Sequence, residues 1–173
     1  WGYTLLGSGW LIYKTEGELQ TWARRAGRIA ALVVLIMMII VTLWIPTLDT
    51  AVSERWGLRY PMPDWSQLLP LSPVPLLVAL SFWMLFRSLN NGKSYAPYLW
   101  SVALFLLGYI GLLIGIYPYL VPWELSFRDA AAAANAQALL LVGALILLPI
   151  ILGYTAYAYW VFRGKVRADS GYH

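Results

Sequence analysis

Four long stretches of the chain contain no charged side chain, and they constrain the fold more than any other feature. They cover residues 29–48, 65–86, 94–123 and 130–162. A bilayer core of about 30 Å is crossed by roughly 20 helical residues, because each residue of an α-helix rises about 1.5 Å. Each stretch is long enough to span a membrane once, so we expect an all-α, polytopic transmembrane bundle.

A fifth uncharged stretch, residues 1–13, opens the chain and is too short to cross a bilayer. It lacks the basic segment and the small-residue cleavage site of a signal peptide. We interpret it as the end of a truncated span, so the expected fold has four complete spans plus the tail of a fifth in a single membrane domain, 1–173. The complete spans are expected at 29–48, 72–88, 96–117 and 130–162, with a loop at 49–71 and a tail at 163–173.

The composition supports a membrane class and excludes others. Hydrophobic residues make up 61% of the chain and charged residues 12%, whereas soluble domains average about 45–50% and about 25%. The net charge of +4 comes from basic residues in separate short segments, which form no single patch, so we expect no nucleic-acid partner. The chain has no cysteine, which rules out a disulfide framework and thiolate ligation of a metal or an Fe–S cluster.

The distribution of Lys and Arg predicts an orientation. Nine of the twelve basic residues fall in the expected loops 14–28 and 87–93 and in the tail 163–173, which alternate with loops poor in basic residues. Segments rich in Lys and Arg stay in the cytoplasm. We therefore expect a cytoplasmic C-terminus and an extracytoplasmic loop at 49–71.

The uncharged stretches hold few groups that could carry chemistry. They contain no ionisable Asp, Glu, Lys, Arg or His side chain, although intramembrane charges are kept where protons or ions must pass. Of the candidate haem ligands, His173 ends a polar tail, and Met37 and Met38 lie among aliphatic residues where packing is the simpler role. The sequence therefore predicts no catalytic residue, no metal site and no cofactor bound by this chain itself.

Two features are expected to serve helix packing. Gly108, Gly111 and Gly115 share one helix face at spacings of three and four, which favours close approach of a neighbouring helix. Pro149 falls inside the last span, where it removes a backbone hydrogen bond and favours a kink. A transporter-like broken helix at Pro149 and Gly153 is the competing interpretation.

Three acidic residues remain as candidates for a proton-surface or interface role. Asp129 closes the sequence Ser126-Phe-Arg-Asp129, whose spacing predicts a capping box at the start of the last helix. Glu16 and Glu18 lie among basic residues at the expected cytoplasmic surface. They are either ordinary solvated charges or a point of proton uptake.

Three motifs in combination identify a family. They are Gly7-Ser-Gly-Trp-Leu-Ile-Tyr-Lys-Thr-Glu-Gly-Glu-Leu19, Tyr117-Pro-Tyr-Leu-Val-Pro122, and Tyr154-Thr-Ala-Tyr-Ala-Tyr-Trp160 within the last span. The chain resembles subunit II of the cytochrome bd-type quinol oxidases, specifically its C-terminal half, and the resemblance covers essentially the whole sequence.

The resemblance implies a respiratory enzyme in a bacterial or archaeal cytoplasmic membrane that oxidises quinol and reduces dioxygen to water. It implies that the haems belong to a partner, the haem-bearing subunit I, and that subunit II is a scaffold without cofactors. Membrane lipid and quinone are the other expected partners. The alternative is a polytopic transporter or membrane-assembly fragment with no redox role.

Overall fold

The computed structural model describes residues 1–48, 53, 54, 57, 58, 65–92, 94–121 and 124–165. These residues form two compact units. The first comprises residues 1–115 together with Lys165, and the second comprises residues 116–164. Each unit is described by itself.

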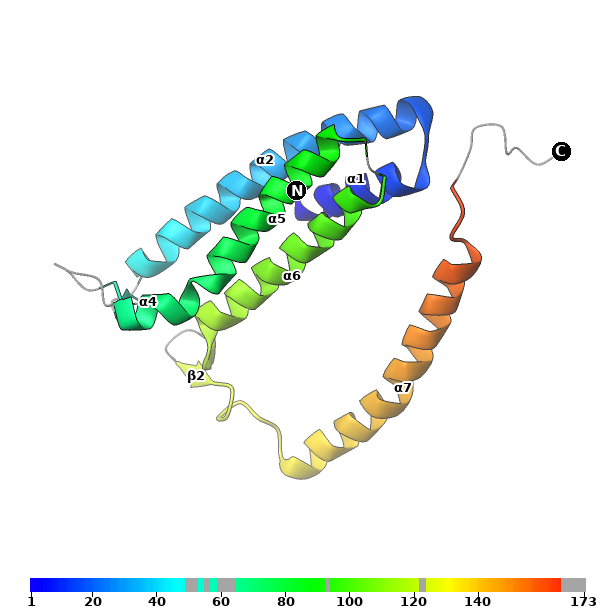
Figure 1. Ribbon diagram of the computed structural model, residues 1–173. Coiled ribbons are helices and arrows are strands. Elements are labelled where there is room, and N and C mark those ends of the chain that lie inside the picture. Colours follow the sequence, from blue (N-terminus) through cyan, green and yellow to red (C-terminus); the bar gives the residue numbers. More distant parts are fainter. Residues whose placement is uncertain (49–52, 55–56, 59–64, 93, 122–123, 166–173) are drawn as a thin grey trace. The chain divides into compact units, whose positions relative to one another are not determined.

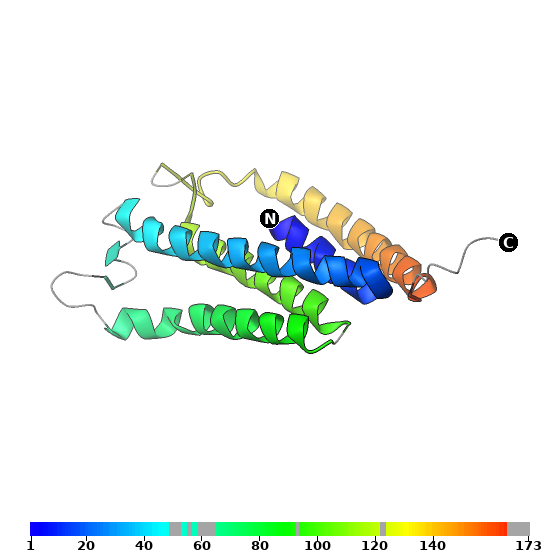
Figure 2. The same ribbon diagram turned by 90° about the horizontal axis from the view of Figure 1, so that it is seen from above.

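The first unit is a bundle of helices (Figure 1). Its elements are α1 (Gly2–Lys14), α2 (Gly17–Leu48), α4 (Trp65–Leu71), α5 (Pro73–Asn90) and α6 (Ala96–Ile116). A short connection at Thr15 and Glu16 turns the chain, so that α2 packs antiparallel to α1, and α5 packs on α2 in turn (Figures 1 and 2). The C-termini of α1 and α5 therefore lie at the same end of the unit as the N-termini of α2 and α6. We call this end of the unit the basic end.

The second unit contains a small hairpin and one long helix. Strands β1 (Tyr119–Val121) and β2 (Leu125–Ser126) pair antiparallel, and α7 (Ala134–Val161) follows. None of the residues of α7 is buried. Its leucine and isoleucine side chains remain open along the whole helix, as expected of a helix that faces lipid or another chain.

Four segments are long and apolar enough to cross a membrane. They are Gly17–Thr47, Leu68–Asn90, Ala96–Ile116 and Ala134–Val161. The expected all-α polytopic class with four complete spans is therefore confirmed, and the chain is a multi-pass membrane protein. The expectation of a single domain stays a prediction.

The expected loop at 14–28 is wrong for most of its length, because α2 begins at Gly17 rather than at residue 29. Ala23, Gly27 and Ala30 are buried at spacings of four and three, together with the adjacent Ala31. This pattern makes residues 17–28 an amphipathic helix that packs through small residues. A charge-free stretch predicts only the part of a helix that lies within the hydrocarbon layer. It does not predict the part of the same helix that continues beyond this layer.

The expected loop at 49–71 also ends in a helix, because α4 occupies Trp65–Leu71. Ser72 stands at the N-cap position of α5 and is followed by Pro73 in the first turn. The Ser72 hydroxyl does not cap α5 but donates a hydrogen bond to the Leu69 carbonyl, at 2.7 Å. Helical backbone therefore continues almost unbroken from α4 into α5.

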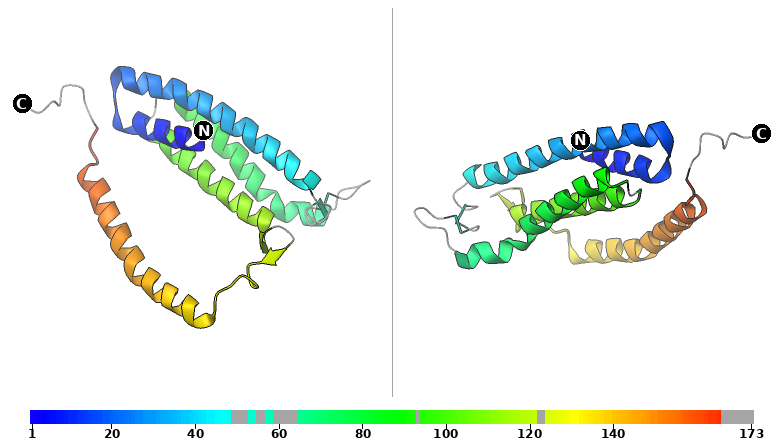
Figure 3. Two further views of the ribbon diagram at one scale, coloured as in Figure 1. Left: turned by 180° about the vertical axis from the view of Figure 1, so that it is seen from behind. Right: turned by 45° about the horizontal axis from the view of Figure 1, so that its top comes forward.

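The buried core of the first unit gathers toward its basic end. Figure 3 presents this bundle from two further sides. The core combines aliphatic side chains with alanine and serine, so the helices approach closely there. Its buried members include Leu5, Ser8, Ile12, Ala23, Ala30, Ala31, Ser81, Phe82, Leu85, Ser88, Leu89, Ser101 and Leu104.

Candidate functional site at the basic end

Arg24 joins α2 to the end of α5. Its guanidinium Nη1 donates to the carbonyl of Leu89 at 3.0 Å and to that of Ser88 at 3.4 Å. These carbonyls belong to the last turn of α5, where helical backbone leaves acceptors without intrahelical donors. A cation at a helix C-terminus also interacts favourably with the helix dipole. Arg24 therefore fixes the end of one span against the start of another.

Gln20 makes the corresponding connection between α2 and α1. Its side-chain amide donates to the carbonyls of Ile12 and Thr15, both at 2.9 Å. The Thr15 hydroxyl donates to the Leu11 carbonyl at 2.7 Å. The last turn of α1 is thus satisfied from within the bundle, although the sequence pattern singled out neither Gln20 nor Arg24.

Aromatic rings surround the basic residue that ends α1. Lys14 Nζ lies 5.2 Å from the centre of the Trp10 ring and 5.4 Å from that of Tyr13. Trp10 in turn packs edge-on against Tyr98 of α6, with ring centres 5.2 Å apart. This arrangement places amphipathic rings and a cation at one level, which is typical of a membrane–water interface.

The acidic candidates at this end lie on the surface. Glu16 pairs with Lys165 at 3.3 Å, and both side chains are more than a third exposed. Glu18 is exposed in the first turn of α2. Exposed ion pairs contribute little to stability, and the proton-surface role of Glu16 and Glu18 stays a prediction.

Asp129 does not start a helix, because α7 begins five residues later at Ala134 with Ala133 as its N-cap residue. The expected helix over residues 130–133 is therefore wrong. The Ser126 hydroxyl donates to Asp129 Oδ2 at 2.6 Å, and the Asp129 amide donates back to the Ser126 oxygen at 3.2 Å. These bonds close an exposed turn after the hairpin. The two end residues of the Ser-x-x-Asp motif therefore bond to each other within this turn, and no helix starts there.

The glycine face of α6 meets only loose contacts within the chain. A Cβ added at Gly108 would lie 3.9 Å from Met38 Cε, and one at Gly111 would lie 4.0 Å from Val74 Cγ1. No atom from another described part of the chain lies within 4 Å of a Cβ at Gly115. The role of this face in helix packing stays a prediction, as does the kink at Pro149 inside α7.

The close approach within the bundle occurs instead at Gly9 and Gly27. A Cβ at Gly9 would lie 3.0 Å from Tyr98 Cα and 3.3 Å from the Ser101 hydroxyl oxygen. A Cβ at Gly27 would lie 2.9 Å from the Ser8 hydroxyl oxygen. The sequence Gly7-Ser-Gly9 carried this signal, since small residues mark close helix contacts in membranes.

Among the described residues, no group of three or more His, Cys, Asp or Glu residues could hold a metal ion. The absence of a haem ligand in this chain stays a prediction. Met38 packs against the hydrophobic core, and Met37 points outward with 53% of its surface exposed. His173, the remaining candidate ligand, lies outside the described residues.

The fold and the basic end together define a polytopic helical membrane protein, in which polar side chains fix helix ends and long apolar faces stay open. The family model for cytochrome bd terminal oxidase subunit II matches residues 1–162, so the chain belongs to that family. A comparison with curated proteins found no match. The family implies that the chain is one subunit of a terminal oxidase complex, and the resemblance noted in the sequence is confirmed.

Proposed function

We propose that this chain is the scaffold partner of the haem-bearing subunit in a cytochrome bd-type quinol oxidase. The complex oxidises quinol and reduces dioxygen to water. The haems belong to the partner subunit I, and this chain supplies neither a haem ligand nor a catalytic group. The family match supports the assignment to the complex.

The observation that carries the scaffold role is the separation of apolar and ionisable groups along the helices. None of the described residues of α6 and α7 is charged. Large side chains such as Leu106, Leu139 and Ile150 are more than half exposed, so lipid or a second subunit must cover them. Among the described residues, the charged side chains lie in the first twelve residues of α2, near other helix ends or in connections, and Arg24 caps the end of α5.

The same distribution of charge supports the orientation of the chain. The basic end of the first unit holds Lys14, Arg24, Arg25, Arg28 and Arg87. Basic residues concentrate on the cytoplasmic side of membrane proteins. We place this end and the C-terminus in the cytoplasm of a bacterial or archaeal cell, with the 49–71 segment outside.

Neutralising the acidic candidates tests whether the chain is free of catalytic groups. In the intact complex, Glu16→Gln, Glu18→Gln and Asp129→Asn are each expected to keep full haem content and oxygen uptake within about twofold of the wild type, because these groups are solvated at the surface. Haem spectra and oxygen uptake are measured on the same samples. A tenfold fall in turnover at full haem occupancy, about 1.4 kcal/mol of barrier, would assign that residue to a proton path.

A further inference from the structure

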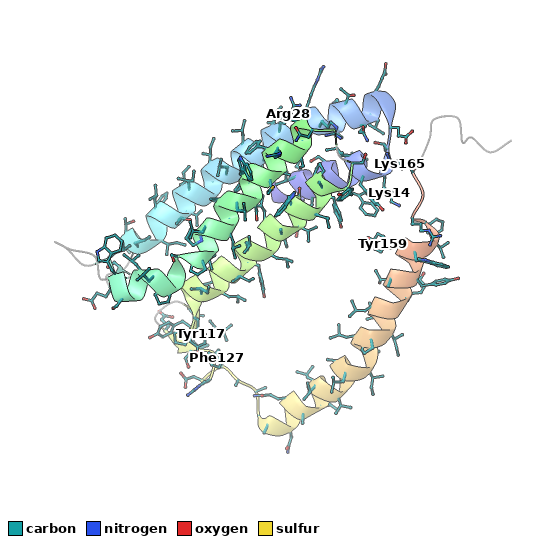
Figure 4. All side chains as sticks on the ribbon, viewed as in Figure 1. Lys14, Arg28, Tyr117, Phe127, Tyr159 and Lys165 are labelled. Atoms are coloured by element: carbon teal, nitrogen blue, oxygen red, sulfur yellow. The ribbon has the colours of Figure 1, made fainter. Side chains whose placement is uncertain are left out.

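One face of α2 changes from basic to apolar along the helix. Its residues recur at spacings of three and four and are all exposed to the outside of the bundle. We call them the arginine face: Trp22, Arg25, Arg28, Ile29, Leu32 and Ile36. The apolar members are exposed by half or more of their surface, from 61% at Trp22 to 50% at Ile36. Arg28 is labelled on this helix in Figure 4.

The two arginines of this face have no acidic partner among the described residues. The adjacent Arg24 turns inward and is engaged with the carbonyls of α5. Three guanidinium groups therefore lie within five consecutive residues, and the described part of the chain does not neutralise the outer two. Such a site attracts an anion that can accept several hydrogen bonds.

The length of α2 sets the depth of these arginines in a membrane. Its 32 residues correspond to about 48 Å at about 1.5 Å per residue, more than the roughly 30 Å of a hydrocarbon core. The uncharged residues 29–48 are enough to fill that core. Arg25 and Arg28 consequently lie at the level of the lipid phosphates, with Trp22 one turn further out in the interfacial zone.

We propose that the arginine face binds one anionic phospholipid. Arg25 and Arg28 hold its headgroup phosphate, and an acyl chain lies along Ile29, Leu32 and Ile36. Arginine suits this role because its planar donors match phosphate oxygens in pairs. This helix face is cationic at the depth of the lipid phosphates and aliphatic deeper in the membrane. It therefore complements a lipid with an anionic headgroup and apolar acyl chains. This inference does not depend on the oxidase role.

The test measures phospholipid retained by the purified complex. The complex is exchanged into detergent with equal phosphatidylglycerol and phosphatidylcholine, and bound lipid is quantified by mass spectrometry. Arg25→Gln with Arg28→Gln is expected to lower retained phosphatidylglycerol by about tenfold, since basic side chains near the surface attract anionic lipid. Arg25→Lys with Arg28→Lys keeps the charge and should retain most of it. Arg128→Gln, on the turn after the hairpin, is the matched control and should equal the wild type.

Three results would overturn the proposal. One is equal retention of the two lipids by the unmodified complex, a measurement that holds even if a variant fails to assemble. Another is displacement by inorganic phosphate or dihexanoylphosphatidylglycerol as readily as by the long-chain lipid, which would indicate a site for free anions. The third is loss of the second subunit rather than of lipid from the glutamine variant, which would make this face a protein interface.

Discussion

Replacing Arg24 with glutamine is expected to lower the free energy of unfolding of the first unit by about 2–4 kcal/mol. The change removes one good hydrogen bond from a charged donor, at 3.0 Å, which contributes about 1.5–3 kcal/mol, and a weaker one at 3.4 Å. It also removes a cation from a helix C-terminus, where the dipole interaction adds about 0.3–1 kcal/mol. The Ser88 and Leu89 carbonyls, which belong to buried residues, would lose this donor. Thermal unfolding of the purified complex, compared across variants, gives the measurement.

Two further variants separate the hydrogen bonds from charge alone. Arg24→Lys keeps the charge and a donor, and it should recover about half of the lost stability. Arg87→Gln removes a charge from the last turn of α5, where the exposed side chain lies 5.5 Å from the centre of the Trp83 ring. An exposed cation–π contact contributes about 0.5–1 kcal/mol, so this control should lose little. Equal losses in Arg24→Gln and Arg87→Gln would contradict the capping role of Arg24.

Gly9→Ala is expected to destabilise the bundle by about 1–3 kcal/mol, the usual cost of overpacking a well-packed site. The new methyl group would lie 3.0 Å from Tyr98 Cα and 3.2 Å from Tyr98 N. Both are backbone atoms of α6, so neither can rotate away, and α1 must shift from α6. The Trp10–Tyr98 ring contact would shift with it. Reduced thermal stability of the complex is the readout.

Gly7→Ala is the matched control on the same helix. Apart from the adjacent backbone of α1, no atom of the described residues lies within 4 Å of a Cβ at Gly7. Alanine is favoured over glycine inside a helix by about 0.8–1.0 kcal/mol, so this variant should be neutral or slightly stabilised. If Gly9→Ala proved as stable as Gly7→Ala, α1 and α6 would not meet through their backbones.

The number and approximate position of the spans could be predicted because they follow mainly from the free-energy cost of placing a charge in the membrane. A charged side chain in hydrocarbon is expensive, so the charge-free stretches of 20 residues or more report the spans directly. Helix ends follow less directly from the sequence. Pro97 falls in the first turn of α6, where proline is favoured, whereas the Ser72 hydroxyl bonds backward to Leu69 because α4 precedes it.

The interior of the bundle could not be predicted in the same way. The glycines of α6 have the regular spacing of a packing seam, yet Gly9 and Gly27 make the close contacts within the chain. Spacing along one helix does not say which face meets a neighbour, since that depends on how the helices are rotated. The capping role of Arg24 was hidden for a related reason. Its acceptors lie 64 and 65 residues away in the sequence.

Purification of the complex through a tag on this chain tests the central claim most directly. The measurement is the reduced-minus-oxidised absorption spectrum of the eluted material, with quinol-dependent oxygen uptake recorded on the same fraction. The account predicts that a second, haem-bearing chain elutes with this one and that the fraction consumes oxygen when quinol is supplied. A colourless homo-oligomer of this chain, stable and without oxygen uptake, would contradict it.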